Sequence, residues 1–291
     1  MTGVAQSPWL VPDWPAPPQV RALFTTRGVS AADGASAAPF DYFNLGDHVG
    51  DQADAVAANR ARLARAVGGA RPVFMNQVHG TAVCQWPADP QAAPTDQAAP
   101  DLADGASADA AVSASPRVAC TVMVADCLPV LLTNRAGSVV AAAHAGWRGL
   151  ASGVLQSTLA SFRAVAPAAR AQTAINSEAN EVLAWLGPCI GPRAFEVGPE
   201  VRQAFVANDS GAAACFAAHG AGKYLADLPG LARRVLAAQG VTAVYGNDSS
   251  DNWCTVAQPA RFYSYRRDQA PLGGTGRMAA CIWLAAAADP Q

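Results

Sequence analysis

The sequence is poor in charged residues, and especially in lysine. Only 14% of the 291 residues are charged, and Lys223 is the single lysine. The net charge is -2, so the chain lacks the basic excess with which proteins bind nucleic acid or anionic lipid. Hydrophobic residues make up 51% of the chain, which is typical of a compact globular protein. We therefore expect no nucleic acid and no membrane as partner.

The chain also lacks several familiar signatures. Its longest nearly apolar run, residues 278–288, is too short to span a bilayer, and the first basic residue is Arg21, so we expect no targeting segment. The seven cysteines stand singly without a CxxC pair, which favours reduced thiols in the cytoplasm. No GxGxxG or Walker A motif occurs, and the glycine-rich residues 273–278 lack the GKS/T ending.

Strand and helix patterns are mixed along the chain, without a repeat. Strand-like segments cover residues 20–28, 73–80, 82–86, 118–132, 138–146, 261–267 and 278–285. Helical patterns cover residues 51–67, with Asp51 as the cap, 150–165 and 225–238. Because strands outnumber helices and do not alternate with them, we expect an α+β fold of mixed β-sheets flanked by helices.

The domain organisation predicted from composition is simple. We expect residues 1–291 to form a single domain. Residues 87–107 are rich in Pro, Ala and Asp and have almost no large apolar side chains, so we expect a flexible insertion loop there. Strand-like segments on both sides argue against a domain boundary at this loop.

Residues that could do chemistry stand where apolar segments end. Of the four histidines, His48, His79 and His144 lie within two residues of a glycine and beside apolar residues. A histidine at a strand end is exposed at one edge of a sheet, and the glycine lets another group approach closely. His219 lies in an alanine-rich region, and we give it no role.

Asp126 and Cys127 interrupt an otherwise apolar strand. A thiol that faces histidines can act as a nucleophile with histidine as its base, or as a metal ligand beside two imidazoles. His79, Cys127 and His144 would form a zinc site with a fourth position open to water or substrate. Their spacings are long, and each residue taken alone is more often an ordinary core or turn residue.

Further candidate substrate contacts lie in or beside apolar runs. Arg27 and Arg148 could clamp an anion such as phosphate, because guanidinium groups form paired hydrogen bonds with its oxygens. Asn44, His48 and Gln77 are candidate contacts to the remainder of a substrate. The alternative for the two arginines is ordinary pairing with surface carboxylates.

Six ordered motifs resemble those of the laccase-domain, or YfiH-like, family. In chain order they are NQVHG, ADCLPVLL, HAGWRGL, GPCIGPRAFEVGPEV, CT at Cys254-Thr255, and RFYSYRRD followed by TGRMAACI. The similarity begins near FTTRGVS and ends near Leu284, so it covers most of the chain. The resemblance implies that the zinc ligands of the family fall on His79, Cys127 and His144. It also implies a single layered domain of mixed sheets with flanking helices.

The resemblance implies an activity as well. Family members are described as purine nucleoside phosphorylases, which implies phosphorolysis of adenosine, inosine, guanosine and methylthioadenosine, with deamination of adenosine as a side activity. The family also carries the label multicopper polyphenol oxidase. Four histidines cannot supply the centres of a multicopper laccase, so we expect zinc and disfavour copper.

Two alternatives to this activity stay open at the level of sequence. One is a cysteine hydrolase that uses Cys127 as its nucleophile. The other is an accessory protein of the cell envelope with a role in peptidoglycan editing. The sequence also leaves open whether the protein is a monomer or a homodimer.

Overall fold

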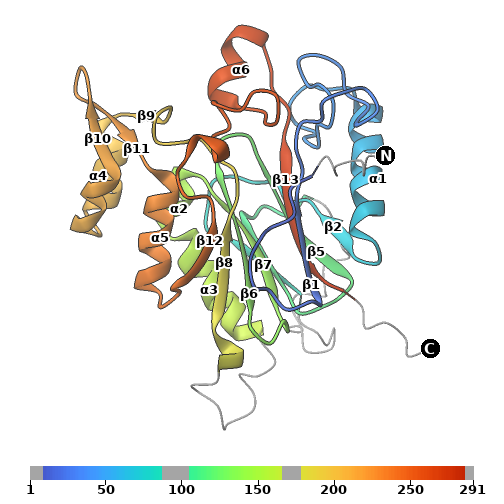
Figure 1. Ribbon diagram of the computed structural model, residues 1–291, viewed down its shortest axis with the longest axis horizontal. Helices are drawn as coiled ribbons and strands as arrows, with labels where there is room; N and C mark the ends of the chain where they lie inside the picture. The colour runs from blue at the N-terminus through green and yellow to red at the C-terminus, as the bar shows by residue number, and fades with distance from the viewer. Residues whose placement is uncertain (1–8, 87–104, 166–177, 286–291) are drawn as a thin grey trace, which may run out of the picture.

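The computed structural model of the protein describes residues 9–86, 105–165 and 178–285. Two β-sheets lie face to face between helices, and a smaller sheet stands to one side (Figure 1). The expected α+β fold of mixed sheets with flanking helices is confirmed. The insertion expected at 87–107 lies outside the described residues, apart from residues 105–107.

The larger sheet has six strands in the order β12-β8-β6-β7-β4-β3. The strands are β12 (Ala243–Gly246), β8 (Val182–Leu186), β6 (Leu128–Asn134), β7 (Val140–Ala145), β4 (Ala110–Ser113) and β3 (Val83–Trp86). The central strands β6 and β7 are antiparallel, with Pro129 opposite His144. This register brings the start of β6, next to Cys127, beside the end of β7, which carries His144.

The second sheet has four strands in the order β1-β13-β5-β2. The strands are β1 (Val20–Phe24), β13 (Met278–Leu284), β5 (Val118–Val124) and β2 (Arg71–Val73). Every residue of β5 and β13 is buried. Along β5, Val118 and Val122 pack between the two sheets, whereas Ala119 and Met123 pack towards the opposite layer, as the two-residue period of a strand requires.

Helices cover the outer faces of both sheets (Figure 1). Helix α1 (Ala53–Val67) packs its buried Leu63 and Val67 on the four-stranded sheet. The six-stranded sheet is covered by α2 (Trp147–Ser152), α3 (Val154–Val165) and α5 (Leu228–Ala238). The apolar core therefore has three layers, one between the sheets and one under each helical cover.

The remaining elements are short. The smaller antiparallel sheet has the order β10-β11-β9. The elements are β9 (Glu196–Val197), β10 (Phe216–His219), β11 (Lys223–Ala226), α4 (Pro199–Val206), α6 (Tyr265–Leu272), and 3-10 helices at Glu178–Asn180, Ser210–Cys215 and Asp251–Trp253. Within residues 9–86, 105–165 and 178–285, no helix combines the length and the hydropathy that a membrane crossing requires.

Three predicted elements differ from those observed. The segment 261–267, predicted as a strand, is a turn followed by α6, because the hydroxyl of Ser264 caps a helix there. The helix predicted over 150–165 is two helices separated at Gly153, whose φ of 101° ends the first one. The segment 73–80 has strand structure only at its first residue.

Two helix starts also differ from the prediction. The helix expected over 225–238 begins at Leu228, because the side chain of Asp227 caps it by accepting the N–H of Gly230. Helix α1 is preceded by Gln52 as its capping position rather than by Asp51. The carboxylate of Asp51 instead accepts hydrogen bonds from the Gln52 N–H and from a side-chain amide of the preceding loop.

Asn59, on the buried face of α1, ties the loop before the helix to the core. Its side-chain oxygen accepts the N–H of Ala35 at 2.9 Å. Its amide donates to Ser36 Oγ at 3.0 Å and to the backbone oxygen of Asn44 at 2.9 Å. With a further bond to the backbone oxygen of Tyr42 at 3.3 Å, one buried side chain satisfies polar groups from four positions of the loop before the helix.

We expect Asn59→Ala to lower the free energy of unfolding by about 2–4 kcal/mol, because several buried polar groups lose their partner at once. Urea denaturation of both proteins measures the difference. The matched control is Asn208→Ala, at an exposed position, which should change stability by no more than about 0.5 kcal/mol. Equal losses in the two variants would contradict the anchoring role of Asn59.

Candidate metal centre

Three side chains from separate segments meet at one place. His79, Cys127 and His144 each offer one ligand atom, and these atoms all lie within 4.8 Å of one another. The Nε2 atom of His79 is 3.8 Å from Cys127 Sγ, and the two imidazole rings lie edge to face with their centres 4.8 Å apart. The structure therefore brings together the three residues that the sequence singled out as ligands.

The strand ends position these side chains. Cys127 directly precedes β6, and His144 is the next-to-last residue of β7, so the antiparallel register places them side by side. His79 lies in the turn between β2 and β3. Exposure increases across the cluster, from buried His144 through partly buried Cys127 to exposed His79, so the site opens to solvent on the His79 side.

A buried carboxylate, Asp109, holds two of the three ligands. Its Oδ1 atom is 2.8 Å from His144 Nδ1. It also accepts backbone N–H groups from Val78 at 3.2 Å, His79 at 2.9 Å and Gly80 at 2.6 Å. Because Nδ1 of His144 is engaged, its Nε2 atom is the one available to a metal, as is usual for metal-binding histidines. Asp109 was not predicted from the sequence, where its only signal is one charge within an alanine-rich segment.

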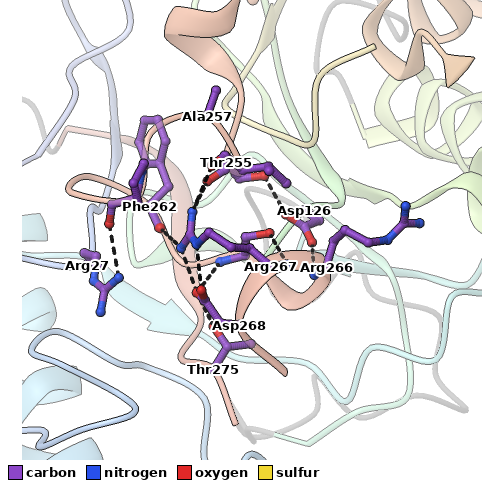
Figure 2. Close-up of polar contacts among 12 residues, drawn as sticks. Arg27, Asp126, Thr255, Ala257, Phe262, Arg266, Arg267, Asp268 and Thr275 are labelled. Carbon is purple, nitrogen blue, oxygen red and sulfur yellow. Dashed lines mark hydrogen bonds and ion pairs between the residues drawn. The ribbon is translucent and has the colours of Figure 1, made fainter. Parts of the chain in front are cut away.

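Asp126, next to the ligand Cys127, supports the turn between β5 and β6. Its φ of 91° is a conformation that residues other than glycine rarely adopt, and His79 has a similar φ of 60°. The Asp126 carboxylate accepts the Thr255 hydroxyl at 2.5 Å and the Arg266 N–H at 2.6 Å (Figure 2). Both turns therefore have a strained backbone that hydrogen bonds from other segments stabilise, as is common at functional sites.

Gly146 lies directly against two of the ligands. A Cβ atom at this position would stand 2.8 Å from Cys127 Sγ and 3.1 Å from a ring carbon of His79. Gly149, in the following helix α2, approaches the backbone oxygen of Gly80, which a Cβ would meet at 3.1 Å. The glycines therefore allow the turn that follows His144 to pack closely against the cluster.

The pKa values of Cys127 and His144 are shifted by their neighbours in the cluster. Burial raises the pKa of the Cys127 thiol, but the charges and hydrogen bonds of His144 and His79 outweigh it and lower that pKa to about 6. Burial lowers the pKa of His144, but Cys127 and Asp109 outweigh it and raise that pKa to about 9. The cluster therefore favours a thiolate, which is the form of cysteine that binds metals.

The donor set fits a metal ion. Two imidazole nitrogens and one thiolate are ligands that zinc takes in proteins, and three protein ligands leave a position for substrate. The contact from Asp109 to His144 is the kind of outer support that orients metal-binding imidazoles. The other two histidines lie outside the cluster: His48 contacts Asp47 at 3.3 Å and His219 contacts Glu196 at 3.6 Å.

Two of the predicted substrate contacts are engaged with their own chain. Arg27 donates to the backbone oxygens of Asp41 and Pro259 and lies 3.6 Å from the Asp41 carboxylate. Asn44 is fully buried, and its side-chain oxygen accepts the N–H groups of Gly46 and Arg277. The structure thus places both residues in loop-anchoring contacts.

The other three predicted contacts have different surroundings. His48 and Gln77 line one cavity of about 180 Å³, together with Arg60. Gln77 also exchanges two hydrogen bonds with the backbone of Met123, at 2.8 and 2.7 Å. Arg148 is exposed and stacks over the Trp147 ring, with its guanidinium carbon 4.5 Å from the ring centre.

Comparison with known proteins identifies the family. Residues 21–285 match the family model described as multi-copper polyphenol oxidoreductase laccase. The chain belongs to this family. A purine nucleoside phosphorylase of Pseudomonas aeruginosa is 48% identical over 277 residues, which cover 95% of this chain and 98% of that protein. The purine nucleoside phosphorylase YfiH of Escherichia coli is 47% identical over 276 residues, with 94% and 98% coverage. The resemblance inferred from the motifs is confirmed.

Solved structures share the fold of this laccase-family chain. A Neisseria meningitidis protein of the DUF152 family superposes with a TM-score of 0.79 at 43% identity, covering 96% of this chain and all of that one (100%). The structure of YlmD from Geobacillus stearothermophilus gives a TM-score of 0.77 at 28% identity and covers 97% of both chains. The layered arrangement is therefore common to chains of widely different sequence.

The substitution Asp109→Asn tests whether Asp109 supports metal binding in this laccase-family chain. An amide cannot accept all four hydrogen bonds of the carboxylate, so we expect metal affinity to fall about 10- to 100-fold. Competition with a chromogenic zinc chelator measures the affinity. Asp13→Asn, at an exposed position, is the control and should leave the affinity unchanged. Wild-type affinity in the Asp109 variant would disprove the supporting role.

The packing of Gly146 gives a second prediction. The methyl group of Gly146→Ala would meet the Cys127 sulfur, so we expect the purified variant to hold much less than one metal ion per chain. Elemental analysis of purified protein gives the metal content. Gly80→Ala is the matched control, because its added methyl group would meet nothing closer than 3.5 Å. A full metal complement in the Gly146 variant would show that the close packing is irrelevant to binding.

Proposed function

We propose that this protein is a zinc-dependent purine nucleoside phosphorylase. The observation that carries the proposal is the grouping of His79, Cys127 and His144 in a chain whose relatives are named purine nucleoside phosphorylases. The proposed substrates are adenosine, inosine, guanosine and methylthioadenosine together with phosphate, and adenosine deamination is a proposed side activity. We propose that the protein works in the cytoplasm as a monomer or homodimer, without nucleic acid or membrane partners.

Phosphorolysis makes specific demands on the site. An oxygen of phosphate forms a bond to C1′ of the sugar while the bond between C1′ and purine N9 breaks. The electron pair of that bond goes to the purine, which takes up a proton. The transition state carries positive charge on the sugar, by analogy with glycoside cleavage. The site must therefore hold an anion beside the sugar and stabilise the departing base.

The three ligands and their support would serve this reaction by orientation. A zinc ion held by them would act as a Lewis acid towards a substrate oxygen. Asp109 keeps the ring of His144 fixed, and the exposure of His79 leaves that side of the cluster accessible to a substrate. Fixed ligands hold the reacting groups in one geometry, which lowers the entropic cost of the reaction.

Five further residues are proposed to serve substrate binding, either by direct contact or by shaping the site. The cavity that His48 and Gln77 line supports a role in binding the nucleoside. Arg148 is exposed in the first turn of helix α2, shortly after His144, which supports contact with an anion. Arg27 and Asn44 are anchored to their own chain, so their proposed contribution is to shape the surrounding loops.

A cysteine hydrolase is the second candidate, and one observation favours it. The lowered pKa of Cys127 and the 3.8 Å distance to His79 also suit a thiolate nucleophile beside an imidazole acid. The two candidates need the thiolate in different states, because a sulfur that binds a metal is not free to attack a substrate. Metal content and covalent labelling therefore distinguish them.

We expect purified wild-type protein to hold about one zinc ion per chain and to release purine from adenosine, inosine and methylthioadenosine only when phosphate is present. His144→Ala should lose most of the zinc and reduce phosphorolysis at least about 100-fold, because only two ligands remain. Elemental analysis and chromatography of the released bases measure both effects. Ammonia release from adenosine without phosphate tests the proposed deamination.

His219→Ala is the matched control, since His219 lies outside the cluster, and it should retain zinc and activity. Full activity in zinc-free protein, with covalent labelling of Cys127, would support the hydrolase instead. Zinc-loaded protein without turnover of any purine nucleoside would contradict both enzymes and favour an accessory role.

A further inference from the structure

The strand register places Arg277 at the start of the turn that carries Cys127. In the antiparallel pair β13–β5, Met278 stands opposite Val124. Arg277, one residue earlier, is therefore at the level of Ala125, two residues before Cys127. The backbone N–H of Arg277 donates to Asn44 Oδ1 at 2.8 Å, which fixes the residue at the end of the strand.

The side chain of Arg277 is partly buried and held in place. Gly46 makes room for it, since a Cβ atom at Gly46 would stand 2.7 Å from Arg277 Cγ. One terminal nitrogen, Nη1, donates to the backbone oxygens of Thr275 at 3.0 Å and Gly276 at 3.1 Å. The guanidinium carbon lies 6.0 Å from the ring centre of Tyr265. The orientation of the guanidinium is therefore determined by its own surroundings.

The charge of Arg277 has no carboxylate partner within the described part of the chain. By contrast, Arg27 lies 3.6 Å from a carboxylate of Asp41, and Arg60 lies 3.2 Å from one of Asp47. The Nε and Nη2 atoms of Arg277 donate no hydrogen bond to residues 9–86, 105–165 or 178–285, and neither atom is sealed from solvent. Two donors on one edge of a fixed guanidinium are thus available to a ligand.

Negative groups of the candidate metal site act on Arg277 electrostatically. Burial lowers the pKa of Arg277, and the charges of Cys127 and Asp126 oppose that effect. Both groups are already engaged, Cys127 with the two imidazoles and Asp126 with Thr255 and Arg266. A partly buried cation next to such a site is suited to an anionic ligand that arrives with the substrate.

We infer that Arg277 binds the phosphate that takes part in the reaction. The inference rests on the proposed phosphorylase function and assigns to Arg277 the role for which the sequence suggested Arg27 and Arg148. A guanidinium presents two parallel N–H donors that match two oxygens of phosphate. Its place opposite Ala125, two residues before Cys127, puts the bound anion at the end of the sheet that carries the candidate metal ligands.

Steady-state kinetics of the zinc-loaded enzyme test the inference with Arg277→Gln. We expect the KM for phosphate to rise about 10- to 100-fold and the KM for inosine to change less than about threefold, because the lost contact is made to one substrate only. Arg277→Lys keeps the charge without the paired donors and should give a smaller rise. Calorimetric titration with inorganic phosphate should show the same order of affinities without turnover.

Arg163→Gln, at an exposed position of α3, should leave both KM values unchanged. If Arg277 only balances the charge of Cys127 and Asp126, its variants will lose zinc or raise both KM values together, and the inference is overturned. It is also overturned if Arg27→Gln or Arg148→Gln raises the KM for phosphate while Arg277→Gln does not. If wild-type protein shows no phosphorolysis, the proposed function fails first.

Discussion

The candidate metal centre depends on the hydrogen bonds that the buried carboxylate of Asp109 accepts. A charge removed from water is costly unless donors surround it, and Asp109 has four, one from His144 and three from the backbone of residues 78–80. These contacts join the end of β7 to the turn that carries His79. They also explain why that turn tolerates a positive φ, because its N–H groups converge on one acceptor.

A second buried acid, Asp126, completes the frame from the other side. Its carboxylate receives donors from Thr255 and Arg266, which belong to the last part of the chain, and its neighbour Cys127 faces the two histidines. Segments separated by more than a hundred residues thus converge on one short turn. The two-sheet core makes this possible, because β5, β6 and β7 are buried along their whole length and their ends hold fixed positions.

The three residues of the cluster were predictable from the sequence, whereas the side chains that support them were not. His144 and Cys127 interrupt apolar strands, and such interruptions are visible in a linear pattern. Asp109 acts through contacts to residues about 30 positions away, which no local pattern records. The segment 261–267 was predicted as a strand because its aromatic residues favour strands, but the hydroxyl cap of Ser264 and the contact of the Arg266 N–H with Asp126 hold a helix start there.

The arrangement of charge also bears on the chemistry that the family description suggests. A multicopper centre needs many imidazoles, whereas only His79 and His144 reach this cluster, and the remaining two histidines contact carboxylates elsewhere. Arg277 adds a cation near these residues, and no carboxylate in the described residues forms an ion pair with it. A neutral phenol would bring no charge to balance that guanidinium, but phosphate would. The proposed phosphorolysis therefore supplies the anion that would complement this charge, whereas the phenol oxidation suggested by the family description does not.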